Sequence, residues 1–242
     1  MRILISGACG VLAQAICHSL DESATQFVLI DRDKQGLERL KQTLTTPTVT
    51  LQLDLNDLDA LSEALTTLEI KGLDACVHAA SLPPENTPYE RLDSSVLQTM
   101  FNVHVQAPHR INQWAYPYLK ASSQATILHF SSVHTHKPLA QATAFRTTKA
   151  ALEMLSHETA LHWGKEGINV HTLLPGGLAS KMLDAQGTHF GYTPEAYQTA
   201  LSTVTKAGDL SDVTSVVRFL LSDQARYLNG LVIPIDGGYH RT

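Results

Sequence analysis

Short apolar segments alternate with longer segments of helical periodicity along the whole chain. The apolar segments are hydrophobic nearly throughout, which is typical of parallel strands covered by helices on both faces of a sheet. This alternation predicts a single α/β domain over residues 1–242, with a doubly wound parallel sheet of about seven strands. Strands are expected at Arg2–Ser6, Gln26–Ile30, Thr48–Leu53, Ala75–His78, Thr126–Ser131, Asn169–Leu174 and Leu231–Ile235. Helices are expected at Val11–Leu20, Lys34–Thr43, Asp57–Leu68, Ser94–Lys120, Ala144–Gly164 and Leu210–Ser222.

The ends of these helices carry residues that commonly begin or end helices. Asp57 and Ser211 are expected as N-caps, and Gly164 and Gly167 are expected to end the helix that precedes them. The least regular stretch, residues 176–207, mixes glycines with polar and aromatic residues. In sheets of this kind such a stretch often covers the ligand crevice, so we expect it to cover the substrate.

Composition excludes several classes of protein. The 242 residues are 43% hydrophobic and 17% charged, as in soluble globular proteins, and no apolar run approaches the ~18 residues of a membrane helix. A net charge of −5 without a Lys/Arg cluster argues against a nucleic-acid or membrane partner. The 12 scattered histidines and three cysteines lack metal-ligand spacing, so no metal site and no disulfide framework are expected. The N-terminus is expected to be a first strand and not a signal peptide, which favours the cytoplasm.

A glycine-rich turn follows the first expected strand. In Ser6-Gly7-Ala8-Cys9-Gly10-Val11-Leu12-Ala13, Gly7 permits a tight turn, and Gly10 lets the backbone approach a pyrophosphate at the helix N-terminus. Asp31 ends the second expected strand, where a carboxylate can bind ribose hydroxyls and repel a 2′-phosphate. We therefore expect a Rossmann-like site for NAD, with NADP less favoured, although Arg32 beside Asp31 could accept its phosphate. Asp54 is expected to contact the adenine, its alternative being a helix-capping acid.

With these motifs and the spacing of Ser132 and Lys149, the chain resembles the short-chain dehydrogenases/reductases from end to end. Pro175-Gly176 and the ending Asp236-Gly237-Gly238 are similar to motifs of that family, whereas His78-Ala79-Ala80-Ser81 departs from the family's Asn-Asn-Ala-Gly. The resemblance and the glycine turn together imply a cofactor site formed by Gly7, Cys9, Gly10, Val11, Leu12, Asp31, Arg32, Asp54, Leu55, Ala79, Ala80, Lys149, Pro175, Gly176, Leu178 and Ser180.

The catalytic set departs from the family in two of four positions. The family uses an Asn, a Ser, a Tyr and a Lys, of which Ser132 and Lys149 are present here. Phe145 stands at the Tyr position and has no proton to donate, and His104 stands at the Asn position. His104 and His134 are the candidates to move the missing proton, because histidine titrates near neutral pH. The alternatives are structural: a solvated lysine, a capping serine, a packing phenylalanine and a buried histidine.

These residues leave three functions open. The first is an NAD(H)-dependent oxidoreductase that acts on a secondary alcohol or ketone with a rebuilt proton relay. The second is a catalytically silent dinucleotide-binding sensor or partner subunit, and the third is elimination or isomerisation in the same pocket. The substrate is expected to be a small molecule shaped by Met182, Phe190, Tyr192 and Tyr197. The family resemblance also implies a homodimer or homotetramer formed by the two long helices, with Leu152, Leu155, Trp114 and Tyr118 facing outward.

Overall fold

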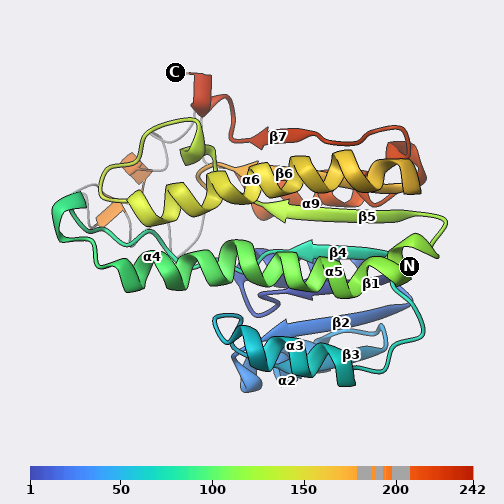
Figure 1. Ribbon diagram of the computed structural model, residues 1–242. Helices are drawn as coiled ribbons and strands as arrows, with labels where there is room; N and C mark the ends of the chain where they lie inside the picture. Colours follow the sequence, from blue (N-terminus) through green and yellow to red (C-terminus); the bar gives the residue numbers. More distant parts are fainter. Residues whose placement is uncertain (179–186, 189–192, 194, 198–207, 242) are drawn as a thin grey trace.

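Seven parallel strands form one sheet in the computed structural model, which describes residues 1–178, 187–188, 193, 195–197 and 208–241. The strand order is β3-β2-β1-β4-β5-β6-β7, so that the winding reverses between β1 and β4. All carboxyl ends of the strands therefore lie along one edge of the sheet (Figure 1). The strands are β1 (Arg2–Ser6), β2 (Gln26–Asp31), β3 (Thr48–Gln52), β4 (Ala75–His78), β5 (Ala125–Phe130), β6 (Ile168–Pro175) and β7 (Val232–Ile235).

Helices cover both faces of the sheet. One apolar layer packs Ile16, Leu37 and Val217 against the strands from α1, α2 and α9. The other layer packs Leu61 and Ile111 from α3 and α5, beside α6. Two covered faces explain why the strands are apolar throughout, and they confirm the predicted doubly wound α/β fold. The helices are α1 (Val11–Leu20), α2 (Lys34–Thr43), α3 (Leu58–Thr67), α4 (Ser94–Phe101), α5 (Ala107–Lys120), α6 (Thr143–Trp163) and α9 (Leu210–Leu220).

The stretch Ser94–Lys120 was expected as one α-helix, and the structure corrects this. A turn of π-helix, Asn102–Gln106, separates α4 from α5, and the N–H of Ala107 donates to the carbonyl of Asn102. Pro108 has no N–H for the carbonyl four residues back, which weakens the α-helical pattern at this point. His104 lies in the middle of this turn and is buried. Turns of this kind are frequent at functional sites.

Most helix ends match the sequence, but one N-cap was wrong. Asp57 caps α3 by accepting a hydrogen bond from Ala60 N, and Gly164 is the C-cap of α6. Ser211 lies inside α9, whose N-cap is Asp209 in a capping box with Asp212. An Asp at the N-cap and another three residues later satisfy two backbone donors reciprocally, which Ser211 cannot do from within the helix.

The outward-facing apolar residues also differ from expectation. Leu152 is buried at 2% exposure, because it lies two helical turns after Phe145 on the face of α6 that packs inward. Leu155, Trp114 and Tyr118 are half-buried, and the rings of the last two contact each other with centroids 5.3 Å apart. Met154 and Leu161 are instead the exposed apolar side chains of α6. Among the described helices, none has the length and apolar character needed to cross a membrane.

Candidate active site

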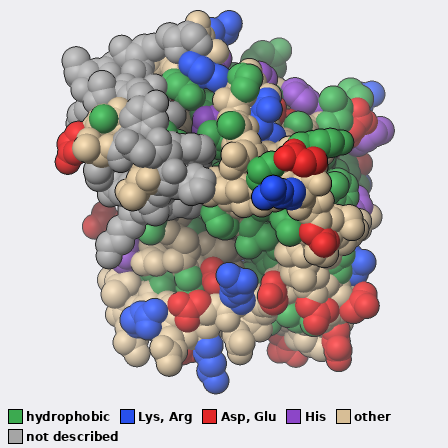
Figure 2. Space-filling model, turned by 90° about the vertical axis from the view of Figure 1, so that its left-hand side faces the viewer, with side chains coloured by type: hydrophobic (Ala, Val, Ile, Leu, Met, Phe, Trp, Pro, Cys, Tyr) green, Lys and Arg blue, Asp and Glu red, His purple; other side chains and the backbone are tan. Residues whose placement is uncertain are grey.

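Two adjoining cavities follow the carboxyl ends of the strands. One of about 150 Å³ is bordered by Asp31 and Asp54, and the other of about 290 Å³ is bordered by Ser132 and Lys149. Both are lined by Gly10, Ala79, Ser81 and Leu82, so they form one groove across the point where the winding of the sheet reverses. On the described part of this face, acidic and basic side chains are interspersed (Figure 2).

The middle of the groove is formed by the glycine turn and the start of α1. Gly7 has a φ of +73°, and a Cβ there would lie 2.4 Å from the Cα of Ala80, so only glycine fits. Gly10 is the N-cap of α1 and has no side chain to cap the helix. The first N–H groups of α1, from Val11, Leu12 and Ala13, therefore face a cavity with the partial positive charge of a helix N-terminus. This arrangement can bind a phosphate.

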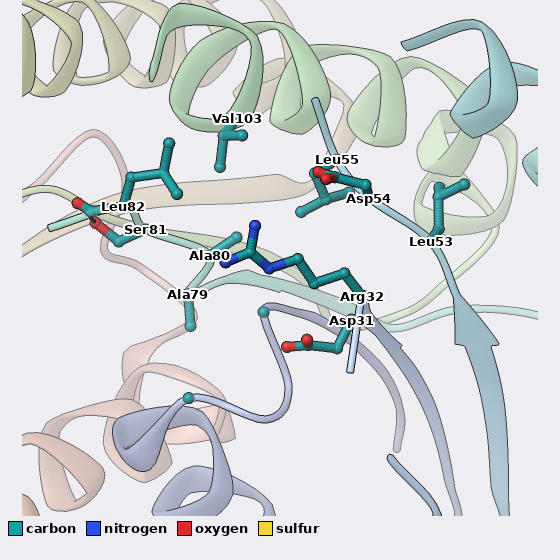
Figure 3. Close-up of a pocket in the computed structure, with 12 residues that line it drawn as sticks. Asp31, Arg32, Leu53, Asp54, Leu55, Ala79, Ala80, Ser81, Leu82 and Val103 are labelled. Atoms are coloured by element: carbon teal, nitrogen blue, oxygen red, sulfur yellow. Dashed lines mark hydrogen bonds between the residues drawn. The ribbon is translucent and has the colours of Figure 1, made fainter. Parts of the chain in front are cut away.

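Charged residues from the ends of β2 and β3 line the smaller cavity (Figure 3). The two carboxylate oxygens of Asp31 accept hydrogen bonds from Cys9 N at 2.9 Å and from Asp33 N at 3.0 Å. The side chain of Arg32 extends across the cavity toward Ala80, above Asp31 (Figure 3). The carboxylate Asp31 is thus fixed by backbone donors, and each of its oxygens keeps a further lone pair for a ligand.

Asp54 lies on the opposite wall of the smaller cavity. One of its carboxylate oxygens accepts a hydrogen bond from Asn56 N at 2.9 Å, and Asp57 caps the next helix. Asp54 is therefore a turn residue on the cavity wall beside Leu55, and the helix cap that was its alternative role belongs to Asp57.

The larger cavity brings together the expected catalytic residues Ser132, His134, Phe145 and Lys149. Ser132 follows β5, and its Oγ accepts a hydrogen bond from His134 N at 3.2 Å. Phe145 and Lys149 lie one turn apart on α6, with Nζ of Lys149 5.8 Å from the centre of the phenyl ring. Nζ donates to the carbonyl of Phe130 at 2.8 Å, and Lys149 is only 1% exposed.

Burial lowers the pKa of Lys149 to about 7, because the charged form loses its hydration. No carboxylate among the described residues forms an ion pair with Nζ to offset that loss. Near Lys149, the rings of His129 and His78 stack with their centroids 5.0 Å apart. The side chain of Asn112 is hydrogen-bonded to both rings. Burial also lowers the pKa of both histidines, so they stay neutral at pH 7.

His104 packs against Phe145 behind the cavity wall and is hydrogen-bonded at both ring nitrogens. Nε2 accepts from Leu82 N at 3.0 Å, so in the neutral ring Nδ1 carries the proton and donates it to Thr148 Oγ1 at 2.8 Å. Thr148 in turn donates to the carbonyl of Ala144 at 2.9 Å. Burial, and secondarily the charge of Lys149, lowers the pKa of His104 well below its usual value. Its ring meets Phe145 edge-on, with centroids 5.9 Å apart.

His134 lines the cavity from the turn after β5. Burial is the largest cause that lowers its pKa, and the nearby charges of Arg146 and Lys137 lower it further. Its ring packs against Tyr239 with centroids 6.0 Å apart, and Nζ of Lys137 lies 3.9 Å from the centre of the Tyr239 ring. The C-terminal segment therefore supports the wall of the cavity that carries His134.

Two acidic residues at this site were not found from the sequence. Glu85, in the loop after β4, accepts hydrogen bonds from the N–H groups of Ala144 at 2.7 Å and of Phe145 at 3.2 Å, and so caps α6 from outside the helix. Glu153 accepts from Ser131 Oγ at 2.7 Å, which ties α6 to the end of β5. No local motif indicates Glu85, because its partners are 59 and 60 residues away.

The far wall of the larger cavity comes from the end of β6. Pro175, Gly176 and Leu178 line it, and a Cβ on Gly176 would lie 2.6 Å from that of Asp236. Tyr197 is buried. Ser180, Met182, Phe190 and Tyr192 lie outside the described residues.

The groove meets the requirements of a dinucleotide. It has the acidic residues Asp31 and Asp54 at one end, a glycine turn with an uncapped helix N-terminus in the middle, and Ser132 with Lys149 at the other end. No cluster of metal-ligating side chains occurs within the part of the chain that the structure describes.

Comparison with known proteins identifies the family. A family model described as Enoyl-(Acyl carrier protein) reductase matches residues 7–240. Protein FixR of Bradyrhizobium diazoefficiens is 31% identical over 78% of this chain and 69% of its own length. L-xylulose reductase of Caenorhabditis elegans is 26% identical over 98% of this chain and 95% of its own length. The crystal structure of levodione reductase superposes with a TM-score of 0.90 at 20% identity, over 100% of this chain and 98% of that one. The chain belongs to the short-chain dehydrogenase/reductase family of oxidoreductases.

Proposed function

We propose that the protein is an NAD(H)-dependent oxidoreductase that interconverts a secondary alcohol and a ketone. The observation that supports this most directly is that Ser132 and Lys149 line one cavity, which adjoins the smaller cavity lined by Asp31. A protein that only bound a dinucleotide would have no need for a serine hydroxyl at the substrate end. The names of the relatives, which include reductases and dehydrogenases of small alcohols and ketones, point to the same class.

The glycine turn, Asp31 and the end of β6 would hold the dinucleotide, whose nicotinamide supplies or accepts a hydride when bound. Gly10, Val11 and Leu12 line the cavity and would face its phosphates, and Asp31 would bind the hydroxyls of the adenosine ribose. The remaining contacts are assigned to Gly7, Cys9, Arg32, Asp54, Leu55, Ala79, Ala80, Lys149, Pro175, Gly176, Leu178 and Ser180.

NAD is favoured over NADP because a 2′-phosphate would meet the fixed carboxylate of Asp31. Arg32 opposes this preference, since its guanidinium spans the same cavity (Figure 3). Asp31 is held in place by two backbone donors, whereas Arg32 is an exposed side chain with many rotamers. The rigid carboxylate therefore dominates recognition of the ribose.

The substrate is proposed to be a small, uncharged and largely apolar molecule. The described wall of the larger cavity is formed by Leu82, Pro83, Pro84, Phe145, Leu178 and Leu210. Its charged member is Lys149, whose Nζ donates a hydrogen bond to the carbonyl of Phe130. Ser132 Oγ can donate to the substrate oxygen while it accepts from His134 N. No arginine of the described wall is available to hold a substrate carboxylate or phosphate.

A silent dinucleotide-binding protein is the second candidate, and elimination or isomerisation in the same pocket is the third. Phe145 has no proton to donate, and both ring nitrogens of His104 are already engaged with Leu82 and Thr148, which favours the silent alternative. The test is hydride transfer with NAD(H) and NADP(H) on a panel of secondary alcohols and ketones. Turnover with NAD(H) would support the oxidoreductase. Tight dinucleotide binding without turnover of any compound would favour the sensor.

We also propose that the protein is a cytoplasmic homodimer or homotetramer. Met154 and Leu161 are 60% and 66% exposed on one side of α6, two turns apart. An apolar pair on the outer face of a long helix suits a contact with a second copy. Light scattering at micromolar concentration tests this. A monomeric mass at that concentration would exclude the proposed assembly. If the protein is an oligomer, the double variant Met154→Glu, Leu161→Glu should be a monomer.

A further inference from the structure

We infer that Lys149 itself delivers the proton to the substrate oxygen, in the role for which Phe145 lacks a hydroxyl. This inference deepens the proposed redox function and rests on it. Lys149 of α6 and Ser132, in the turn that follows β5, line the same cavity. Ser131 Oγ donates to the carbonyl of Lys149 at 3.1 Å, which holds this turn of α6 against the strand.

Nζ of Lys149 has more N–H donors than its hydrogen bond to Phe130 uses. An ammonium group has three donors, and the structure gives one of them to the carbonyl of Phe130. The phenyl ring of Phe145, whose centre lies 5.8 Å from Nζ, has no oxygen that could accept a hydrogen bond from it. Because Lys149 and Phe145 line the same cavity, we place the substrate oxygen, or one water that bridges to it, within hydrogen-bond reach of Nζ, as acid–base catalysis requires.

The groups that face Lys149 leave its charge without a partner. His129 approaches from β5, His104 from the π-helical turn and His134 from the turn after β5. The described residues of the cavity wall include no carboxylate. Glu153, one turn along α6, is bound by Ser131 and by His136, whose Nε2 lies 3.2 Å from its second carboxylate oxygen.

The two histidines proposed from the sequence are poorer donors. Both have a lowered pKa, so at pH 7 each is a neutral imidazole, which is a weak acid. His104 also has both nitrogens in use. Lys149, with a pKa near 7, remains partly protonated at that pH and can both give and regain a proton. Acid–base catalysis is most effective when the pKa lies near the working pH.

The step balances without any further reagent. In reduction, the carbonyl carbon of the substrate gains a hydride from the nicotinamide cofactor, and the carbonyl oxygen gains a proton from Nζ of Lys149. The C=O π bond becomes a C–H and an O–H bond, and Lys149 is left as a neutral amine. The amine then regains its proton from water. Oxidation of the alcohol runs the same steps in reverse, with the neutral amine as the base.

The first test is the pH dependence of kcat in both directions with NAD(H). Reduction requires the ammonium form, so kcat for reduction should fall about tenfold per pH unit above the pKa of Lys149. Oxidation requires the amine, so its kcat should rise through the same pH range. Profiles that stay flat between pH 6 and pH 9 in both directions would contradict the role of Lys149.

Lys149→Arg keeps the positive charge but removes the titration, because arginine stays protonated. We expect kcat to fall by about 100-fold or more and the pH dependence to disappear, with Lys165→Arg on the protein surface as the matched control. In the Phe145→Tyr background the loss from Lys149→Arg should be smaller, since the phenol then donates. If His134→Gln removed the pH dependence and Lys149→Arg kept it, His134 would be the donor.

A measurement without substrate or cofactor gives an independent result. With lysine labelled by ¹³C at Cε, the signal of Lys149 can be assigned by its loss in Lys149→Arg, and its titration followed by NMR. We expect a midpoint well below the ~10.4 of an ordinary lysine. A midpoint near that ordinary value would overturn the assignment. Absence of turnover in the parent and in Phe145→Tyr would refute the proposed function itself, whereas turnover that ignores Lys149 would refute only its role.

Discussion

Nζ of Lys149 lies 5.8 Å from the centre of the Phe145 ring, on the same face of α6 and one turn away. The lysine is buried without a carboxylate partner among the described residues, and the ring beside it has no polar atom. A charge in such surroundings is costly, and its cost is what brings the pKa of Lys149 toward neutrality. The apolar ring of Phe145 is therefore part of the buried surroundings in which Lys149 loses its hydration.

Placing a phenol at position 145 is the most direct test of the proposed catalytic cavity. Phe145→Tyr should increase kcat for reduction of simple ketones by about 10-fold or more, since a positioned acid is worth about 10²–10⁴-fold and His104 still stands in the Asn position. Steady-state kinetics with a panel of β-ketoesters measures the gain, and adding His104→Asn should increase it. If the parent already reduces ordinary ketones rapidly and the variant shows no gain, the lack of a phenol at position 145 does not limit kcat.

Asp31→Asn should weaken the preference for NAD over NADP by at least about tenfold, equivalent to about 1.4 kcal/mol. The substitution removes the charge that faces a 2′-phosphate and keeps an oxygen for one of the two backbone donors. Fluorescence titration of NADH and NADPH measures both affinities. Arg32→Ala is the matched control and should lower the affinity for NADPH alone. Tighter binding of NADPH by the parent would mean that Arg32 governs the ribose end.

The sequence predicted the fold and the course of the groove because those depend on local signals. The apolar strands, the glycine turn and Asp31 at a strand end can each be recognised from a few neighbouring residues in the sequence. The π-helical turn, the capping of α6 by Glu85 and the two hydrogen bonds of His104 depend on partners far along the chain, which no local pattern encodes. Leu152 was misplaced for the same reason, since either face of α6 offers apolar residues and only packing decides between them.

His104 should prove important for stability. His104→Leu leaves the N–H of Leu82 without its acceptor, which should cost about 1–3 kcal/mol of the free energy of unfolding. Urea unfolding measures the loss. His157→Leu, at an exposed position on α6, is the control and should change stability little. The turnover per folded molecule should remain. If turnover were abolished while stability was unchanged, His104 would be the proton carrier after all.

Removing the charge of Lys149 should stabilise the protein most at low pH. The pKa of Lys149 is about 7 in the folded protein and near its ordinary value when unfolded, so between these values the unfolded chain binds more protons and stability rises with pH. Below pH 7 the folded protein carries the full cost of the buried ammonium. Lys149→Met, an apolar side chain of similar length, should therefore raise the free energy of unfolding by about 2 kcal/mol or more at pH 6, since one pKa unit corresponds to about 1.4 kcal/mol. The gain should shrink as the pH approaches 10, because neutral lysine costs little to bury. Thermal unfolding of both proteins at pH 6 and pH 9, without dinucleotide, measures the difference. An equal change in Tm at the two pH values would mean that Lys149 is charged in the folded protein throughout this range.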